Sequence, residues 1–581
     1  MDELKNPDVI PDTKTNAKPN LKNVESAAPK SSGLDRRDLM KLGVGAGVAV
    51  AGILAAQTTA SAQQGATQQP PISPASPLAP RNHNNFQIWP DIRESQEVSA
   101  TTQVGYTVYT GAGWVNNSGR ASGNGPMDEC SRRIVEWVDS YSASKMTDKL
   151  TEALNTLLLD TMGVVMGSGF ESEPARINAR LASQRPGPCT MWGYGIKTSY
   201  EQAAFSNAAM IRHADFNPGA HNNEMFGGVI AVAEDLHSSG PDAMAAMVIA
   251  YEVIAAIGGT GLGDYDPAGF DGPYHAAGAA MAAGKLMGLN KDQLANALSL
   301  AIVPHMPMYV CHIGIQSMWK GTHSSEQVRN GIWAACLARE GMTGPHMPFE
   351  ARDGLIAHIG PFTRDLVLPT SPDGRLSIET IHGDGRGYKR FATEGNNTTF
   401  HNSIAPAIIE WTSADDIASI DAQFHYGGWQ EICDPPKWDP RNRETADHSM
   451  PYNVARRLID KEIYMDSFTK EKYMDPKVRD LMSKIIARPN VDNKDVFTVR
   501  KKNGEQKVFE QGAAPPTTHA EIRAKYDRLC EFAHIDKAQA DRIRETWMNL
   551  KGVKDMAEAV QVVSKFGQPR PLSDKTPPRI S

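Results

Sequence analysis

Residues 241–257 read PDAMAAMVIAYEVIAAI, an apolar run that is long enough for an α-helix and rich in alanine. Residues 275–288 (HAAGAAMAAGKLMG) and 327–340 (QVRNGIWAACLARE) have the same texture, with glycine among the alanines. Apolar segments of this length predict buried helices, and small side chains let neighbouring helices approach closely. A further helix is expected over 291–303, where Asn290 is a suitable N-cap. Together these segments predict a large helical domain.

The pattern changes along the chain on both sides of these helices. Helical periodicity begins near Met127, whereas short alternating runs follow residue 370, at Ile417–Tyr426 and Asp495–Val499, with turn residues at Asn503-Gly504. Helical patterns recur among the alternating runs, at Tyr452–Leu458, Pro476–Ile486 and Thr518–Phe532. We therefore expect a mainly α fold with three parts: a helical domain over 127–388, a smaller α+β lid domain over 389–525, and C-terminal helices over 526–581 that return to the helical domain.

The first 62 residues contain the parts of a twin-arginine export signal in the right order. Arg36-Arg37 precedes an uncharged run from Leu42 to Ala56, which is too short to span a bilayer comfortably. Ala60-Ser61-Ala62 then matches the small-x-small pattern that a signal peptidase cleaves. Residues 63–126 are expected to form a Pro- and Gln-rich linker and an extended arm. These features predict a periplasmic protein that meets the translocation machinery during export; the alternative is a chance arginine pair before a membrane anchor.

The composition excludes several classes of protein. A net charge of −7 and the absence of an extended basic block argue against nucleic acid as the main partner. The S-x-x-K motif at Ser317–Lys320 lacks the S-D-N and K-T-G partners that penicillin-binding enzymes require. No CxxC or Cys/His cluster in the sequence has metal-ligand spacing, so neither a zinc site nor an iron–sulfur cluster is expected. The six cysteines lie singly, at Cys130, Cys189, Cys311, Cys336, Cys433 and Cys530.

Three polar clusters interrupt the apolar helical context. HADFNPGAHNNE occupies 213–224, QSMWKG occupies 316–321, and YKRF occupies 388–391, while His275 opens another apolar helix. Each alone has an ordinary structural explanation, such as a helix cap or a solvated lysine. Lysines and histidines that converge where two domains meet suit a small polycarboxylate substrate. Cations neutralise carboxylates, and a neutral histidine or a lysine of lowered pKa moves a proton on carbon.

From Met127 to Val563 the sequence resembles the MmgE/PrpD family, which contains 2-methylcitrate dehydratase, cis-aconitate decarboxylase and iminodisuccinate epimerase. The resemblance rests on motifs in the same order as in the family: the Asp-Phe-Asn segment that ends in a histidine before GGVIAVAE, the Ser-Met-Trp-Lys-Gly segment, the helix that ends REGMTGP at 339–345, ETADHSMPY at 444–452, and the helix of Lys525.

The resemblance implies a large helical domain with a smaller α+β lid, a homodimer, and catalysis without a metal or cofactor. It implies an active site between the domains, with catalytic residues Asp215, His221, Lys320 and Lys389 and substrate-binding residues His275 and Tyr452. This chain departs from the family pattern at 215–224, where the loop is shorter and the family's H-P-S-D is H-N-N-E. The substrate therefore does not follow from the resemblance.

We expect a metal-independent lyase that acts on a small hydroxy-polycarboxylate, with 2-methylcitrate dehydration as the leading reaction. An epimerase or isomerase, or a decarboxylase of a related di- or tricarboxylate, is the alternative enzyme. A periplasmic carboxylate-binding protein on a degenerate enzyme scaffold is the alternative from another class, because the loop at 215–224 is altered.

Each candidate residue has an expected role. Lys320 and Lys389 would clamp substrate carboxylates as point charges. His221 would transfer the proton, with Asp215 orienting it or acting as the alternative base. Tyr452 would donate a hydrogen bond to the substrate, and His275 is a second-rank candidate. The alternative is that Asp215 and His221 only cap a helix. Replacing Lys320 is expected to reduce kcat/KM while the melting temperature stays nearly unchanged.

Overall fold

The computed structural model describes residues 127–573, apart from 171, 219–220, 262–273, 352–353, 360–361, 363, 491 and 493. The export signal over 1–62 and the linker and arm over 63–126 lie outside the described residues.

Three closely packed helices form the centre of the helical part: α10 (Gly240–Gly259), α11 (Tyr274–Leu286) and α13 (His323–Arg339). Their glycines stand where the backbones nearly touch. A Cβ atom on Gly278 would lie 2.7 Å from the carbonyl oxygen of Ala250, and one on Gly331 would lie 2.3 Å from that of Ala276. The expectation of closely approaching helices is confirmed. α10 is long and apolar enough to cross a membrane, but 89% of its most apolar window is buried, as in a core helix.

Further helices surround this centre: α5 (Glu129–Ser140), α6 (Asp148–Val164), α7 (Glu173–Ala182), α8 (Tyr200–Arg212), α9 (Phe226–Asp235) and α12 (Lys291–Ile302). At α12, Asn290 forms the expected N-cap, and Gln293 completes a capping box. A short hairpin, β1 (Cys189–Met191) with β2 (Ile196–Thr198), follows α7 and was not expected from the sequence.

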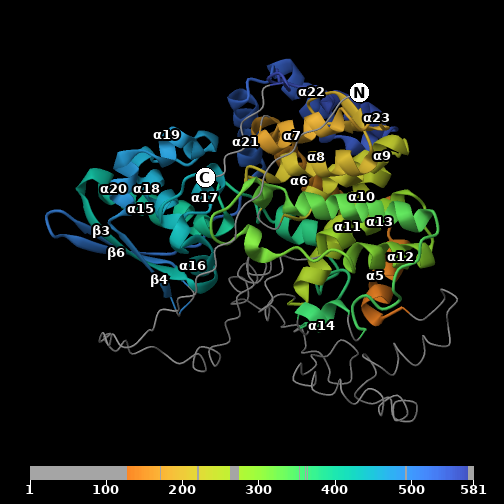
Figure 1. Cartoon of the computed structure of the whole chain (residues 1–581), viewed down its shortest axis with the longest axis horizontal. Coiled ribbons are helices and arrows are strands. Elements are labelled where there is room, and N and C mark those ends of the chain that lie inside the picture. Colours follow the sequence, from red (N-terminus) through yellow and green to blue (C-terminus); the bar gives the residue numbers. More distant parts are fainter. Residues whose placement is uncertain are drawn as a thin grey trace, which may run out of the picture. The chain divides into compact units, whose positions relative to one another are not determined.

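The C-terminal helices pack against this same part. α21 (His519–Phe532) contacts α6, and α23 (Met556–Val563) contacts α9, while α22 (Lys537–Trp547) lies next to both of its neighbours in sequence (Figure 1). Buried side chains of all three helices belong to the core of the helical part, among them Ile522, Tyr526, Ile543 and Val560.

Residues 400–510 form a smaller α+β part around a four-stranded sheet of order β4-β3-β5-β6. The central strand β3 (Ile417–His425) pairs in parallel with β4 (Ile485–Asn490) and antiparallel with β5 (Val496–Lys501). β6 (Gln506–Glu510) pairs antiparallel with β5 across the expected Asn503-Gly504 turn, where Gly504 has a φ of 90°. A mainly α fold with a smaller α+β part is thus confirmed.

Helices cover this sheet and supply a second hydrophobic core. α15 (Ala405–Trp411), α18 (Met450–Asp460) and α20 (Pro476–Met482) contribute Ile408, Val454 and Leu481 to it. One expected boundary is wrong: the helix predicted over 476–486 ends at Met482. The reason is that Ile485 and Ile486, whose branched side chains suit a strand, pair with Ile420 and Asp421 of β3.

Candidate active site

The polar segment after α8 has an unusual backbone. Asp215 and His221 both adopt left-handed conformations, with φ of 53° and 57°. Residues other than glycine occupy this region seldom, and such conformations concentrate at functional sites because the surrounding structure must hold them in place. The segment leads from Arg212, the last residue of α8, to the short helix η5 (Asn222–Met225).

The carboxylate of Asp215 is buried and accepts hydrogen bonds from three cations. Arg212 Nη1 and Lys389 Nζ donate to Oδ1 at 2.7 and 2.6 Å, and Lys320 Nζ donates to Oδ2 at 3.0 Å. Burial alone would raise the pKa of Asp215, but the charges of Arg212, Lys320 and Lys389 outweigh it and hold the pKa well below its ordinary value. Asp215 is therefore an anion around neutrality.

Lys320 links Asp215 to a second buried carboxylate, Asp447, at the end of α17 (Arg443–Asp447) in the α+β part. Its Nζ donates to Asp447 Oδ1 and Oδ2 at 2.9 and 3.1 Å. Arg443 Nη1 also donates to Asp447 Oδ2, at 3.2 Å, and His448 Nδ1 lies 2.6 Å from Oδ1. The pKa of Asp447 is low because Lys320, His448 and Arg443 together outweigh the effect of burial. We call Arg212, Asp215, Lys320, Lys389, Arg443 and Asp447 the ion-pair cluster.

The two predicted lysines already have protein partners. Lys320 is fully buried between the two carboxylates, and Lys389 Nζ donates to the carbonyl oxygens of Asp215 and Thr393 as well as to the Asp215 carboxylate. A clamping role would require a substrate carboxylate to replace one of these acceptors. The burial of Lys320 also changes the expectation for its removal, because two buried carboxylates would lose a partner and the fold would lose stability.

His221 lies beside the cluster and is paired with Glu224. Its Nδ1 is 3.2 Å from Glu224 Oε1, and its side chain is 14% exposed. Burial, followed by the charges of Arg212 and Lys389, lowers the pKa of His221 well below its ordinary value, so the ring is neutral at pH 7. Burial raises the pKa of Glu224. A neutral imidazole next to a carboxyl group of raised pKa suits proton transfer in either direction.

The alternative in which His221 caps a helix is not what the structure shows. His221 occupies the N-cap position of η5, but its side chain makes no capping hydrogen bond there.

The other two predicted residues lie differently. His275 is buried near the start of α11, its ring 5.1 Å from that of Tyr274, and it is close enough that its positive charge would lower the pKa of His221. Tyr452 belongs to the second hydrophobic core, where its hydroxyl donates to the carbonyl oxygen of Ser467. Hydrogen bonds and ion pairs therefore bring Asp215, Lys320 and Lys389 together, and His221 lies beside them through Glu224. His275 is near enough to His221 to affect its pKa, and the Tyr452 hydroxyl is directed elsewhere.

The sequence analysis did not identify Arg212 and Arg443 as site residues, nor their neighbour His213. Arg443 Nη2 and His213 Nδ1 are buried and have no hydrogen-bond partner among the described residues. The two side chains are neighbours, since Arg443 Nη1 donates to the carbonyl oxygen of His213 at 3.4 Å. Burial and the charges of Arg443 and Lys320 lower the pKa of His213, which is therefore neutral. Buried polar atoms without partners are rare, and at a charged cluster they are candidate ligand contacts.

One cavity lies apart from the cluster. It has a volume of about 690 Å³ and is lined by residues of α7, α8 and α13 and of the segment between α7 and α8, among them Arg185, Phe205, Glu326, Arg329 and Trp333. None of the predicted site residues lines it. The candidate active site is therefore the ion-pair cluster with His213, His221 and Glu224.

Comparison with known proteins identifies the family to which the chain belongs. The MmgE/PrpD N-terminal domain model matches residues 132–362, and the C-terminal domain model matches residues 402–551. A cis-aconitate decarboxylase-like protein of Aspergillus oryzae is 21% identical over 76% of this chain and 98% of its own length. Cis-aconitate decarboxylases of Aspergillus terreus and Homo sapiens are 23% and 24% identical, over 61% and 62% of this chain and 77% of their own lengths. With both of its domain models matched in order, the chain belongs to the MmgE/PrpD family and is a lyase of that family.

Proposed function

We propose that the ion-pair cluster binds a small di- or tricarboxylate and catalyses its cleavage by a lyase reaction. The observation that carries the proposal is an excess of positive charge in the ion-pair cluster, in which Arg443 still has a hydrogen-bond donor available. Within the cluster the cations Arg212, Lys320, Lys389 and Arg443 outnumber Asp215 and Asp447, also when Glu224 is counted as ionised. The nearby buried carboxyl groups of Glu394 and Glu444 have raised pKa values, which favour their neutral forms. A buried excess of charge is costly unless an ion of opposite sign offsets it, so an anionic substrate fits.

Arg443 is the group best placed to meet the substrate first. Its side chain is 23% exposed, and its buried Nη2 has no partner among the described residues. Guanidinium groups bind carboxylates through charge-assisted hydrogen bonds. Lys320 and Lys389 hold Asp215 and Asp447 in place and keep the site positive, and a second substrate carboxylate can replace one of their acceptors.

Decarboxylation of cis-aconitate is the first reaction to test, because the relatives described above are named for it. In that reaction the bond from carbon to the leaving carboxylate breaks, its electron pair stays on carbon, and CO2 departs. The cations would stabilise the carbanion, and the carboxyl group of Glu224, whose pKa is raised, would then supply a proton to carbon.

Dehydration of 2-methylcitrate is the second candidate, and the pairing of His221 with Glu224 favours it. Elimination of water needs a base for the C–H proton and an acid for the departing hydroxyl group. The neutral ring of His221 can act as the base, and the carboxyl group of Glu224, with its raised pKa, can act as the acid.

The test is to incubate the purified full-length chain in D2O with cis-aconitate, 2-methylcitrate and aspartate-derived dicarboxylates, and to follow proton NMR spectra and released CO2. Release of CO2 identifies a decarboxylase, and formation of a conjugated alkene from 2-methylcitrate identifies a dehydratase. Exchange of a C–H proton for deuterium without net product would indicate an epimerase. Tight binding of one of these acids with no turnover would contradict the lyase proposal and favour a carboxylate-binding protein.

Two properties that the sequence predicts are part of this proposal. The first is export to the periplasm, which rests on the arginine pair and the cleavage pattern before residue 63. The second is a homodimer, which follows from the family resemblance and which light scattering of the purified protein would test. Exposed apolar side chains at Met308, Val310 and Ile315, each 66–70% exposed, offer surface for a second copy.

A further inference from the structure

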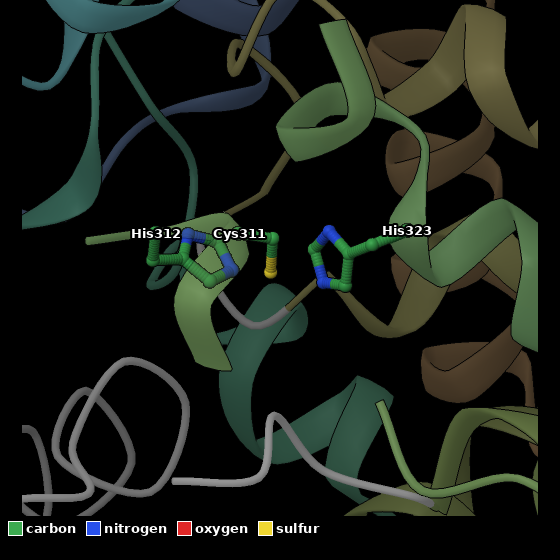
Figure 2. A group of neighbouring side chains, drawn as sticks. All are labelled: Cys311, His312 and His323. Carbon is green, nitrogen blue, oxygen red and sulfur yellow. The ribbon is translucent and has the colours of Figure 1, made fainter. Parts of the chain in front are cut away.

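A group of metal-ligating side chains lies beside the ion-pair cluster and takes no part in the proposed reaction. Cys311 ends the short helix η6 (Tyr309–Cys311), His312 follows it, and His323 begins α13. Their ligand atoms all lie within 4.8 Å of one another. In the view of Figure 2 the Cys311 sulfur projects between the two imidazole rings, whose centroids are 4.9 Å apart, and the three side chains lie next to one another. Residues 311 and 323 are separated by a loop, so no short sequence motif reveals this group.

The surroundings of His323 prepare one of its ring nitrogens for a metal. His323 Nδ1 lies 2.9 Å from the carbonyl oxygen of Lys320, which can only accept a hydrogen bond. The proton of the neutral ring must therefore be on Nδ1, which leaves the lone pair on Nε2. A carbonyl that holds the distal N–H is the usual outer partner of a metal-ligating histidine.

Acidic and imidazole groups also lie near His312. Its Nδ1 lies 3.8 Å from Glu431 Oε1, and the centroid of its ring is 4.9 Å from that of His323 and 5.8 Å from that of His448. The ligand atoms of His312, Glu431 and His448 also lie within 4.8 Å of one another. A thiolate at Cys311 and the carboxylate of Glu431 would together offset the charge of a divalent cation.

We propose that Cys311, His312 and His323 bind one divalent transition-metal ion of the zinc class. Thiolate and imidazole are the ligands that select such ions over magnesium or calcium. Zinc–nitrogen and zinc–sulfur bonds of about 2.0 and 2.3 Å place tetrahedral nitrogen and sulfur ligands roughly 3.3–3.5 Å apart, so from separations of at most 4.8 Å the ligand atoms need to approach one another by no more than about 1.5 Å. Cys311 is partly exposed, which gives the ion a path from solvent, and its thiol releases a proton on binding.

The experiment uses Co²⁺ as a spectroscopic probe on the full-length chain, after treatment with a chelator. A Co²⁺ titration is expected to produce a thiolate-to-cobalt charge-transfer band that saturates at one ion per chain and disappears when Zn²⁺ is added. Cys311→Ser should abolish this band. His323→Gln should weaken Co²⁺ binding by at least about 10-fold, because it removes one of three protein ligands.

Cys530→Ser is the matched control, because Cys530 is a free cysteine in α21 that belongs to none of the candidate metal-binding groups among the described residues. This variant should keep the wild-type band. The proposal is overturned if the wild-type chain gives no saturable band, if Cys311→Ser keeps it, or if Cys530→Ser loses it. These outcomes do not depend on turnover, so they are independent of the proposed lyase reaction.

Discussion

Removing the ammonium group of Lys320 is expected to destabilise the fold, and the arrangement of its partners sets the size of the effect. In Lys320→Met, Asp215 keeps Arg212 and Lys389 at 2.7 and 2.6 Å. Asp447 loses its nearest cation and keeps Arg443 at 3.2 Å. Breaking a buried ion pair on one side costs about 3–5 kcal/mol, and because Asp215 remains paired we expect the lower end, about 3 kcal/mol.

A double-mutant cycle identifies the carboxylate that carries this cost. Adding Asp447→Asn to Lys320→Met removes the uncompensated charge and should recover about 1–3 kcal/mol, whereas adding Asp215→Asn should recover less. The assay is equilibrium unfolding in urea followed by circular dichroism. Lys472→Met is the control, because Lys472 is 38% exposed in a surface pair with Asp460 and should change stability by less than about 1 kcal/mol.

Two results would refute this reasoning. One is a loss in Lys320→Met no larger than the loss in Lys472→Met. The other is further destabilisation, instead of recovery, when Asp447→Asn is combined with Lys320→Met.

Three further predictions concern pH, proton transfer and export. Burial, together with the neighbouring charges of Glu431 and Asp215, raises the pKa of Glu394 from 4.5 to about 8. The protonated carboxyl group therefore contributes stability that is fully present below pH 4.5 and is lost as the pH rises through 8. The melting temperature of Glu394→Gln should accordingly rise relative to that of the wild type between pH 5 and pH 8.5. A difference that stays constant over this range would contradict the prediction. His221→Gln should reduce kcat by roughly 10²–10⁴-fold and flatten the acidic limb of the pH–rate profile, whereas an unchanged profile would place proton transfer elsewhere. The double variant Arg36→Lys/Arg37→Lys should remain in the cytoplasm, as measured by cell fractionation. Unmutated protein that is found in the cytoplasm would contradict the export proposal.

The sequence predicts the helical part well because its signals are local. The alanine- and glycine-rich runs, the Asn290 cap and the Asn503-Gly504 turn each act through neighbouring residues, and all three occur in the structure. Strand β4 was missed because its pairing with β3 joins residues about 65 positions apart in the sequence, and its two isoleucines directly follow a helical pattern.

The candidate site could be predicted only in part, for the same reason. Asp215, Lys320 and Lys389 stood out as charges in apolar surroundings, but their pairing spans 105 and 174 residues. Arg212 ends a helix and Arg443 begins one, so both resemble ordinary surface residues in the sequence. Their burial depends on how the α+β part meets the helical part, which no local pattern encodes.

Substrate binding at Arg443 tests the central claim most directly. Isothermal titration calorimetry with propane-1,2,3-tricarboxylate, a saturated acid that cannot react in either proposed way, measures binding without chemistry. Arg443→Gln should weaken this binding by at least about 10-fold, because it removes a charge-assisted hydrogen bond worth roughly 1.5–3 kcal/mol. The control Arg441→Gln, at a side chain that is 56% exposed and paired with Asp439, should bind as the wild type does. If Arg443→Gln binds as tightly as the wild type, the ion-pair cluster is not the polycarboxylate site.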